Sequence, residues 1–273
     1  SAYLEDAIVS VIGQTYPEWE LVVIDNGSTD GSQSIIKKYL NNKKIRAFLH
    51  PTNMCICKRM NEGIAAASGD FISILYSDDY YLPEKFNKQV KVMQELSPEC
   101  GVAYSPGYQL DVSTQKLEIV KSIESSGEVL KVLFTDFFRG YINPISPLIR
   151  KECLLRYPFD EEIFTEGEAI FFRIAMKYKF AYIDEPLVVM RTHDNNARYA
   201  GKQNAEYFAT GLNKLGRHVD FPGDMTSYYR RFKGIIFRNN AWQNIRLGTD
   251  SQWVRNMLYQ SVHSDWRQIC HHK

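Results

Sequence analysis

The chain has 273 residues, of which 44% are hydrophobic and 24% charged, and its formal net charge is +1. This composition is typical of a soluble globular protein, and the small net charge argues against nucleic acid as a partner. The five cysteines lack zinc-type spacing and predict reduced thiols in a cytoplasmic protein. We find neither a signal peptide nor an apolar run of about 18 residues, so we predict no transmembrane helix.

Roughly the first hundred residues alternate between helical and strand patterns. Apolar residues recur with helical spacing in some segments, and short runs rich in Val and Ile predict buried strands in others. The predicted order is helix 2–14, strand 21–24, helix 35–40, strand 45–49, helix 58–68, strand 71–76 and helix 83–96. This alternation predicts a mostly parallel α/β sheet with helices on both faces. Because such a domain opens with a strand, we expect the natural protein to continue before Ser1.

The pattern after residue 101 is less regular. It predicts strand 102–104, a hairpin over 107–120, helix 129–138, strand 145–149, helix 170–178 and strands 181–183 and 187–191. From residue 196 onward the sequence predicts only helices. We therefore expect an α/β domain over residues 1–195 and a helical C-terminal extension over residues 196–273.

Carboxylates directly follow two of the predicted strands. Asp25 could accept hydrogen bonds from a base or a ribose at the carboxyl edge of the sheet, or it could cap a turn. Asp78 and Asp79 could bind Mg²⁺ or Mn²⁺ together with phosphate oxygens. The alternative for this pair is a helix start, with Asp79 as the capping residue.

Other polar residues could complete a site, and each has a plainer interpretation. Lys58, Arg59 and Asn61 could neutralise a diphosphate, or they could form a solvated helix face. Glu166 or Glu168 could act as a general base, although acidic residues also favour the first turn of a helix. His193, after a short strand, could bind a metal, but a lone histidine is more often a surface residue.

The order of these features resembles the large family-two glycosyltransferases, bacterial inverting enzymes of the GT-A fold. The resemblance runs from Ala2 to about Asn196. The matching stretches are residues 3–8 with 14–17, 20–31, 61–64 with 67–70, 75–79, 185–187, and 191 with 193. Residues 20–31 are the most specific of them, and residues 75–79 match the metal-binding motif of the family.

The resemblance implies a Rossmann-like domain that binds a nucleotide-diphosphate sugar, with a UDP-sugar as the default donor. The sugar would pass with inversion to a hydroxyl group of a saccharide or lipid-linked acceptor, in surface polysaccharide or glycan synthesis. The residues implied in donor binding are Asp25, Lys58, Arg59, Asn61, Ser77 and Asp78. The residues implied in binding Mn²⁺ or Mg²⁺ are Asp78, Asp79 and His193.

Three positions depart from the family pattern. Tyr76 replaces the first aspartate of the metal motif, and Cys55 stands where the family usually has glycine. Gly167 replaces the aspartate that is commonly the catalytic base, which leaves Glu166 and Glu168 as candidates. Tyr76 and Gly167 favour, as an alternative, a protein that binds a nucleotide sugar without turning it over. A nucleotidyltransferase on a similar sheet is the second alternative.

The segment after residue 226 is rich in basic and aromatic residues. Helices that pack on the catalytic domain would have this composition, and so would helices that pair in a homodimer. An interfacial helix lying on anionic lipid, at the inner face of the membrane, is the third interpretation. We favour packing on the catalytic domain.

Overall fold

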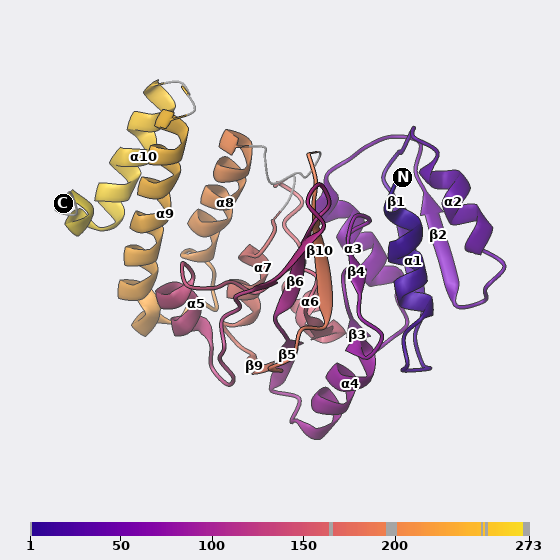
Figure 1. Cartoon of the computed structure of the whole chain (residues 1–273). Helices are drawn as coiled ribbons and strands as arrows, with labels where there is room; N and C mark the ends of the chain where they lie inside the picture. The colour runs from indigo at the N-terminus through magenta and orange to yellow at the C-terminus, as the bar shows by residue number, and fades with distance from the viewer. Residues whose placement is uncertain (1, 164–165, 195–200, 247, 249–250, 270–273) are drawn as a thin grey trace.

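The computed structural model describes residues 2–163, 166–194, 201–246, 248 and 251–269. Helices and strands alternate in its first part, as the sequence predicted (Figure 1). In chain order these elements are α1 (Leu4–Ile12), β1 (Leu21–Asp25), α2 (Ser32–Tyr39), β2 (Ile45–Leu49), α3 (Ile56–Ala66), β3 (Phe71–Ile72), β4 (Tyr80–Tyr81) and α4 (Lys85–Glu95).

β1 and β2 form a parallel pair that helices cover on both sides. Successive side chains of a strand point to opposite faces. Val23 packs with Ile8 of α1 and Ile36 of α2, whereas Ile24 lies within van der Waals reach of Gly63 in α3. Partial burial on both faces explains why β1 is apolar up to its last residue, Asp25.

The remaining strands form two four-stranded sheets of mixed direction. One has the order β3-β8-β5-β9 and the other β4-β10-β6-β7. The new strands are β5 (Cys100–Tyr104), β6 (Gly107–Asp111), β7 (Lys116–Val120), β8 (Leu148–Arg150), β9 (Lys179–Tyr182) and β10 (Val188–Thr192). The predicted α/β class and the hairpin over 107–120 are confirmed. The strand directions are mixed rather than mostly parallel, because short turns such as residues 112–115 can join only antiparallel strands.

Helices dominate the C-terminal part, as expected. They are α5 (Leu130–Asp136), α6 (Lys151–Arg156), α7 (Ala169–Ile174), α8 (Gly201–Leu215), α9 (Thr226–Arg246) and α10 (Ser251–Ser264), followed by the 3₁₀ turn η3 (Trp266–Ile269). In Figure 1, α8, α9 and α10 stand at the end of the molecule opposite β1 and β2. The predicted boundary between residues 195 and 196 lies outside the described residues.

Four phenylalanines join this end to the rest of the core. We call Phe134, Phe137, Phe172 and Phe232 the aromatic cluster. The Phe232 ring of α9 lies 5.6 Å from that of Phe134, 5.2 Å from that of Phe137 and 5.3 Å from that of Phe172. These contacts confirm that the C-terminal helices pack on the preceding part of the chain, as the preferred interpretation expected. The contacts with a membrane or a second copy stay predictions.

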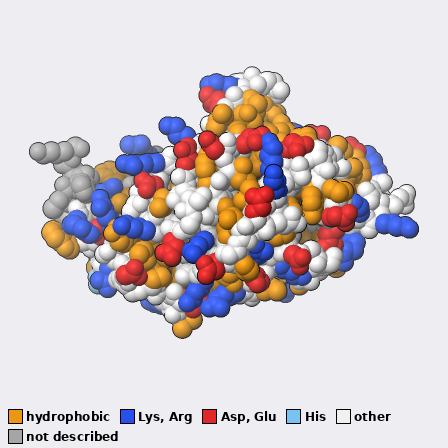
Figure 2. Space-filling model, turned by 90° about the horizontal axis from the view of Figure 1, so that it is seen from below, with side chains coloured by type: hydrophobic (Ala, Val, Ile, Leu, Met, Phe, Trp, Pro, Cys, Tyr) orange, Lys and Arg blue, Asp and Glu red, His pale blue; other side chains and the backbone are white. Residues whose placement is uncertain are grey.

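Charges of both signs are mixed on the surface. Figure 2 shows Lys and Arg side chains interspersed with Asp and Glu over the face seen from below, in keeping with the small net charge. Cys55, Cys57, Cys100 and Cys153, the cysteines within the described ranges, form no disulfide with one another. Across those same ranges, no helix has both the length and the apolar character needed to cross a membrane.

Candidate functional site

Asp25 stands buried at the carboxyl end of β1, where the sequence placed it. Its Oδ2 accepts hydrogen bonds from the backbone N–H of Ser28 at 3.2 Å and from the side-chain amide of Gln33 at 2.8 Å. Gly27 has a φ of +81°, and a Cβ there would lie 2.6 Å from the backbone of Thr52. Only glycine therefore fits, and the loop closes tightly around a fixed carboxylate.

Asn26 ties this loop to the start of α3. Its amide pairs with the backbone of Met54 in both directions, donating to the carbonyl at 2.8 Å and accepting from the N–H at 2.9 Å. The same Oδ1 accepts from Nε of Arg59 at 3.0 Å, and Arg59 also contacts Glu62 at 3.1 Å. Arg59 is therefore buried and held in place, while its neighbour Lys58 is exposed. Sequence reasoning missed Asn26, although it lies within the most specific matching stretch.

Asn61 faces a different part of the chain. Its Nδ2 donates to the carbonyl of Phe159, and its Oδ1 accepts from the N–H of Phe159, both at 2.9 Å. A second contact joins Nδ2 to Glu161 at 3.0 Å. The structure therefore does not bring Asn61 together with Asp25. It fastens α3 to the segment that precedes Glu166.

Asp78 and His193 come together from positions far apart in the sequence. Oδ2 of Asp78 lies 3.3 Å from Nε2 of His193, and both side chains are partly buried. Asp79 is oriented differently: its Oδ1 accepts the backbone N–H of Arg191 at 2.8 Å. Burial and the charge of Asp78 raise the pKa of Asp79 to about 7. Ser77, in the same turn, is exposed.

Arg191 connects this turn with α1. Its guanidinium donates to the carbonyl oxygen of Asp78 at 3.0 Å and pairs with Asp6 of α1 at 2.7 Å. The group also lies over the ring of Tyr3, 4.9 Å from its centre, and that ring is 5.0 Å from the ring of His193. Sequence reasoning assigned no role to Arg191 or Tyr3, although both belong to matching stretches. Together they fix the positions of Asp78 and His193.

The donor set at this point suits a divalent cation that shares its ligands with phosphate. Asp78 offers carboxylate oxygen and His193 offers imidazole nitrogen, which are both acceptable to Mn²⁺. The part of the chain that the structure describes contains no group of three His, Cys, Asp or Glu side chains placed to hold a metal. An ion here would therefore need further oxygen ligands from phosphate or water.

The two candidate bases have different surroundings. Glu166 is buried, and its Oε2 accepts from the Asp160 N–H at 3.0 Å and pairs with Arg173 at 2.7 Å. Burial raises the pKa of Glu166, and the Arg173 charge partly offsets this rise. Glu168, just before α7, is half-buried, and burial raises its pKa as well. Among the described residues no basic side chain pairs with Glu168.

The start of α7 packs against the segment that leads to Asp78. Tyr76 and Gly167 line the same cavity of about 10 Å³, and burial together with the charge of Glu168 raises the pKa of Tyr76. Gly167 has a φ of +54°, and a Cβ there would meet nothing within 4 Å. The space would hold a side chain, but this left-handed backbone conformation favours glycine, so the carboxylate that the family usually has here would strain the backbone. The acids on either side of Gly167 in sequence are Glu166 and Glu168.

Comparisons with known proteins agree on the type of protein. The model of the glycosyl transferase family 2 matches residues 1–173. A putative teichuronic acid biosynthesis glycosyltransferase, TuaG of Bacillus subtilis, is 32% identical over 109 residues, which are 40% of this chain and 42% of that protein. Protein CgeD of the same organism is 34% identical over 137 residues, 47% of this chain and 32% of that protein. The matches thus span less than half of the length of each of these two relatives.

Solved structures share the fold. The mannosyltransferase PcManGT from Pyrobaculum calidifontis, in complex with GDP-Man and Mn²⁺, has a TM-score of 0.64 at 13% identity, covering 98% of this chain and 83% of that one. Residues 1–349 of S. aureus TarS with UDP-GlcNAc give 0.60 at 17% identity, covering 98% and 88%. The GT-A fold is therefore confirmed. Since the family model matches well over half of its residues, the chain belongs to glycosyl transferase family 2.

Proposed function

We propose that the chain transfers a sugar from a nucleotide-diphosphate sugar to an acceptor hydroxyl with inversion. The observation that carries this proposal is the approach of Asp78 to His193 within 3.3 Å, in a family-2 chain. A UDP-sugar is our first choice of donor, supported by the complex of TarS with UDP-GlcNAc. The complex of PcManGT with GDP-Man makes a GDP-sugar the second choice.

The donor residues fall into contacting and supporting groups. In this proposal Asp25 binds the base, while Lys58 and Ser77, whose side chains are exposed, face the phosphates. Asp78 and His193 would hold Mn²⁺ or Mg²⁺, which when bound supplies positive charge against the leaving diphosphate. We assign supporting roles to Arg59 and Asn61, which hold neighbouring segments in place. Asp79 joins them because its Oδ1 accepts the Arg191 N–H.

Glu168 is the proposed general base, which would take the proton of the acceptor hydroxyl. Its raised pKa brings it nearer to the pH at which a base is effective. The charge of Glu168 also contributes to the raised pKa of Tyr76, which lies two residues before Asp78, so Glu168 is near the proposed metal site. Glu166 is the weaker candidate, because Arg173 and the Asp160 N–H hold its carboxylate. We assign Glu166 a positioning role for the loop.

Calorimetric titration with UDP, GDP and dTDP, each with and without Mn²⁺, tests donor binding. We expect one nucleotide to bind only with metal, and Asp78→Ala to abolish that binding. Asp224→Ala is the matched control, because it removes an exposed carboxylate far along the chain. If no nucleotide binds, or if the control loses binding equally, the donor site is wrong.

One alternative function keeps the binding site without the chemistry. Gly167 and Tyr76 stand where the family usually has carboxylates, which favours a protein that binds the donor without turnover. Donor binding with no sugar transfer to a wide panel of acceptors would establish this alternative. Membership of family 2 argues against the nucleotidyltransferase.

We propose surface polysaccharide or glycan synthesis as the setting, with a saccharide or lipid-linked acceptor on the cytoplasmic side. The description of TuaG, a relative, as a teichuronic acid biosynthesis glycosyltransferase supports this setting. Peripheral membrane contact and a homodimer belong to the same proposal. Vesicle flotation of the intact chain tests the membrane contact, and analytical ultracentrifugation tests the homodimer. A chain that does not float with the vesicles would exclude the first, and a chain that sediments as a monomer would exclude the second.

A further inference from the structure

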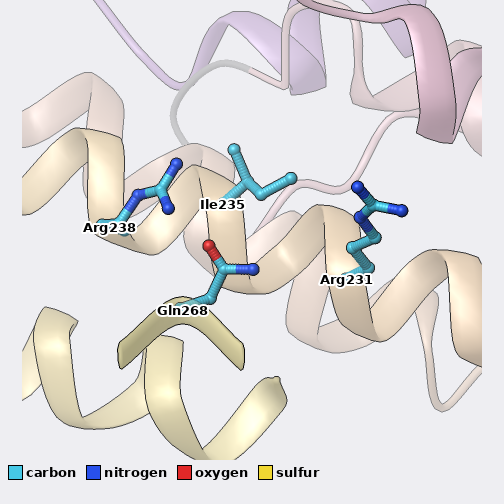
Figure 3. A pocket seen from close by; sticks show the side chains of 4 residues that line it. All are labelled: Arg231, Ile235, Arg238 and Gln268. Atoms are coloured by element: carbon cyan, nitrogen blue, oxygen red, sulfur yellow. The ribbon is translucent and has the colours of Figure 1, made fainter. Parts of the chain in front are cut away.

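A hollow of about 310 Å³ lies between α9 and the 3₁₀ turn η3, lined by Arg231, Ile235, Arg238 and Gln268 (Figure 3). We call it the C-terminal pocket. Its elements belong to the end of the molecule opposite β1, so it is separate from the proposed donor site (Figure 1). None of its residues has a role in the function proposed above.

Two arginines give the C-terminal pocket its charge. Arg231, Ile235 and Arg238 follow one another at intervals of four and three, so they share one face of α9. Figure 3 shows the two guanidinium groups on either side of Ile235. Helix α9 contains no Asp or Glu, and within the described ranges neither arginine forms an ion pair. Uncompensated guanidinium groups in a hollow favour an anion, and phosphate above all.

The nearby acid is already engaged elsewhere. Asp265 accepts from Nε of Arg267 at 2.7 Å through Oδ1, and from Nε2 of Gln268 at 3.2 Å through Oδ2. Both carboxylate oxygens therefore accept hydrogen bonds from residues of η3. This leaves the positive charge of Arg231 and Arg238 available to a ligand.

Gln268 adds a second requirement. Its side chain is only 7% exposed, and its Oε1 is buried without a hydrogen-bond partner among the described groups. The bond from Nε2 to Asp265 fixes the amide, so that Oε1 is the atom left to accept. A buried acceptor needs a donor. A ligand with phosphate oxygens alone would leave this oxygen unsatisfied.

We propose that the C-terminal pocket binds a phosphate ester of a hydroxylated carbon chain, such as a glycerophosphate or a sugar phosphate. Arg231 and Arg238 donate to the phosphate oxygens, and a neighbouring hydroxyl donates to Oε1 of Gln268. The same chemistry occurs in a soluble phosphate ester and in the headgroup of phosphatidylglycerol. The proposal does not depend on the identity of the donor nucleotide.

Titration of the intact chain with glycerol 3-phosphate, and in parallel with inorganic phosphate, tests the proposal. We expect glycerol 3-phosphate to bind more tightly, and Arg231→Gln and Arg238→Gln each to weaken it roughly tenfold or more, since each removes a charge-assisted bond to phosphate. Gln268→Leu should remove the preference over inorganic phosphate. Arg255→Gln, an exposed arginine of α10 outside the pocket, is the matched control.

Vesicles separate the two sources of the ligand. Co-sedimentation with phosphatidylglycerol vesicles, against phosphatidylcholine vesicles, tests the lipid headgroup. Trp266 of η3, the turn that carries Gln268, is 69% exposed and contributes to a fluorescence readout. Binding that depends on Arg231 and Arg238 supports the proposal and assigns the source. No binding in either arm would overturn it, as would equal weakening by Arg255→Gln. Nucleotide binding should be unchanged in every pocket variant, which distinguishes this test from that of the donor site.

Discussion

Replacing Glu166 with glutamine should reduce stability far more than the rate of the chemical step. Glu166 is 2% exposed and Arg173 16% exposed in their ion pair, whose N–O distance is 2.7 Å. The raised pKa of Glu166 indicates that burial outweighs the attraction of Arg173. The loss in the variant therefore comes mainly from the guanidinium that is left behind without its carboxylate.

The magnitude follows from what Arg173 retains. Removing one partner of a buried ion pair lowers the free energy of unfolding by about 3–5 kcal/mol. Arg173 still donates to the carbonyl of Pro158 at 2.7 Å and keeps some solvent contact, so we expect the lower end, about 3 kcal/mol. For a chain of 273 residues, with an unfolding entropy of about 2.1 cal/mol/K per residue, that corresponds to a decrease in Tm of roughly 5 °C. Urea unfolding and thermal melting measure both quantities.

Two further variants serve as controls. Replacing both partners, with Glu166→Leu and Arg173→Met, should recover most of the stability, because no charge is then buried alone. Glu168→Gln should change the melting temperature little and reduce turnover by a factor on the order of 10² to 10⁴, the usual contribution of a general base. If Glu166→Gln instead keeps the wild-type melting temperature and loses turnover a hundredfold, the two roles are reversed and our reasoning is refuted.

Three more predictions concern titration and the metal. Since Glu168 acts deprotonated and burial raises its pKa, the rate should increase with pH through an acidic limb shifted above the ordinary glutamate value; Glu168→Gln should abolish this limb in a pH–rate profile. Asp79→Asn should keep Mn²⁺-dependent nucleotide binding in calorimetry, because an amide oxygen can still accept the Arg191 N–H, and equal loss in Asp78→Asn and Asp79→Asn would contradict this. Burial lowers the pKa of Lys85 well below 10.5, the ordinary value for lysine. At pH values between the two, Lys85 is deprotonated in the folded chain and takes up a proton on unfolding, so the free energy of unfolding should rise with pH. Urea unfolding of Lys85→Met should lack this component, and identical slopes in both proteins would disprove it.

Periodicity located the elements well where one pattern dominates. Strand 45–49 has the predicted bounds, and the hairpin over 107–120 forms as expected. The strand expected over 71–76 ends at Ile72, and the hydroxyl of the next residue, Ser73, bonds with Tyr81 and with the carbonyl of Pro147. The two-residue strand β4 and the six-residue helix α6 are too short to carry a period.

The site was predictable where position alone defines it. Asp25 and Asp78 follow apolar runs, and the carboxyl ends of strands in such sheets are where ligands bind. Sequence could not separate Glu166 from Glu168, because the difference lies in an ion pair with Arg173 that only the folded loop creates. The burial of Lys85 could not be predicted either, because it also depends on contacts that only the folded chain creates. A lysine in an amphipathic helix suggests the surface, yet its Nζ is buried against Ser73 and Gln89.

The aromatic cluster has a consequence for how such chains diverge. Phe232 of α9 fills the space beside Phe134, Phe137 and Phe172, so a lineage that lost the C-terminal helices would expose three aromatic rings at once. We therefore expect the positions of Phe134, Phe137 and Phe172 to vary with the presence of α9: relatives with the helix should keep large apolar residues there, and relatives without it should have polar or smaller ones. The C-terminal helices and three positions of the catalytic domain would then be inherited as one unit.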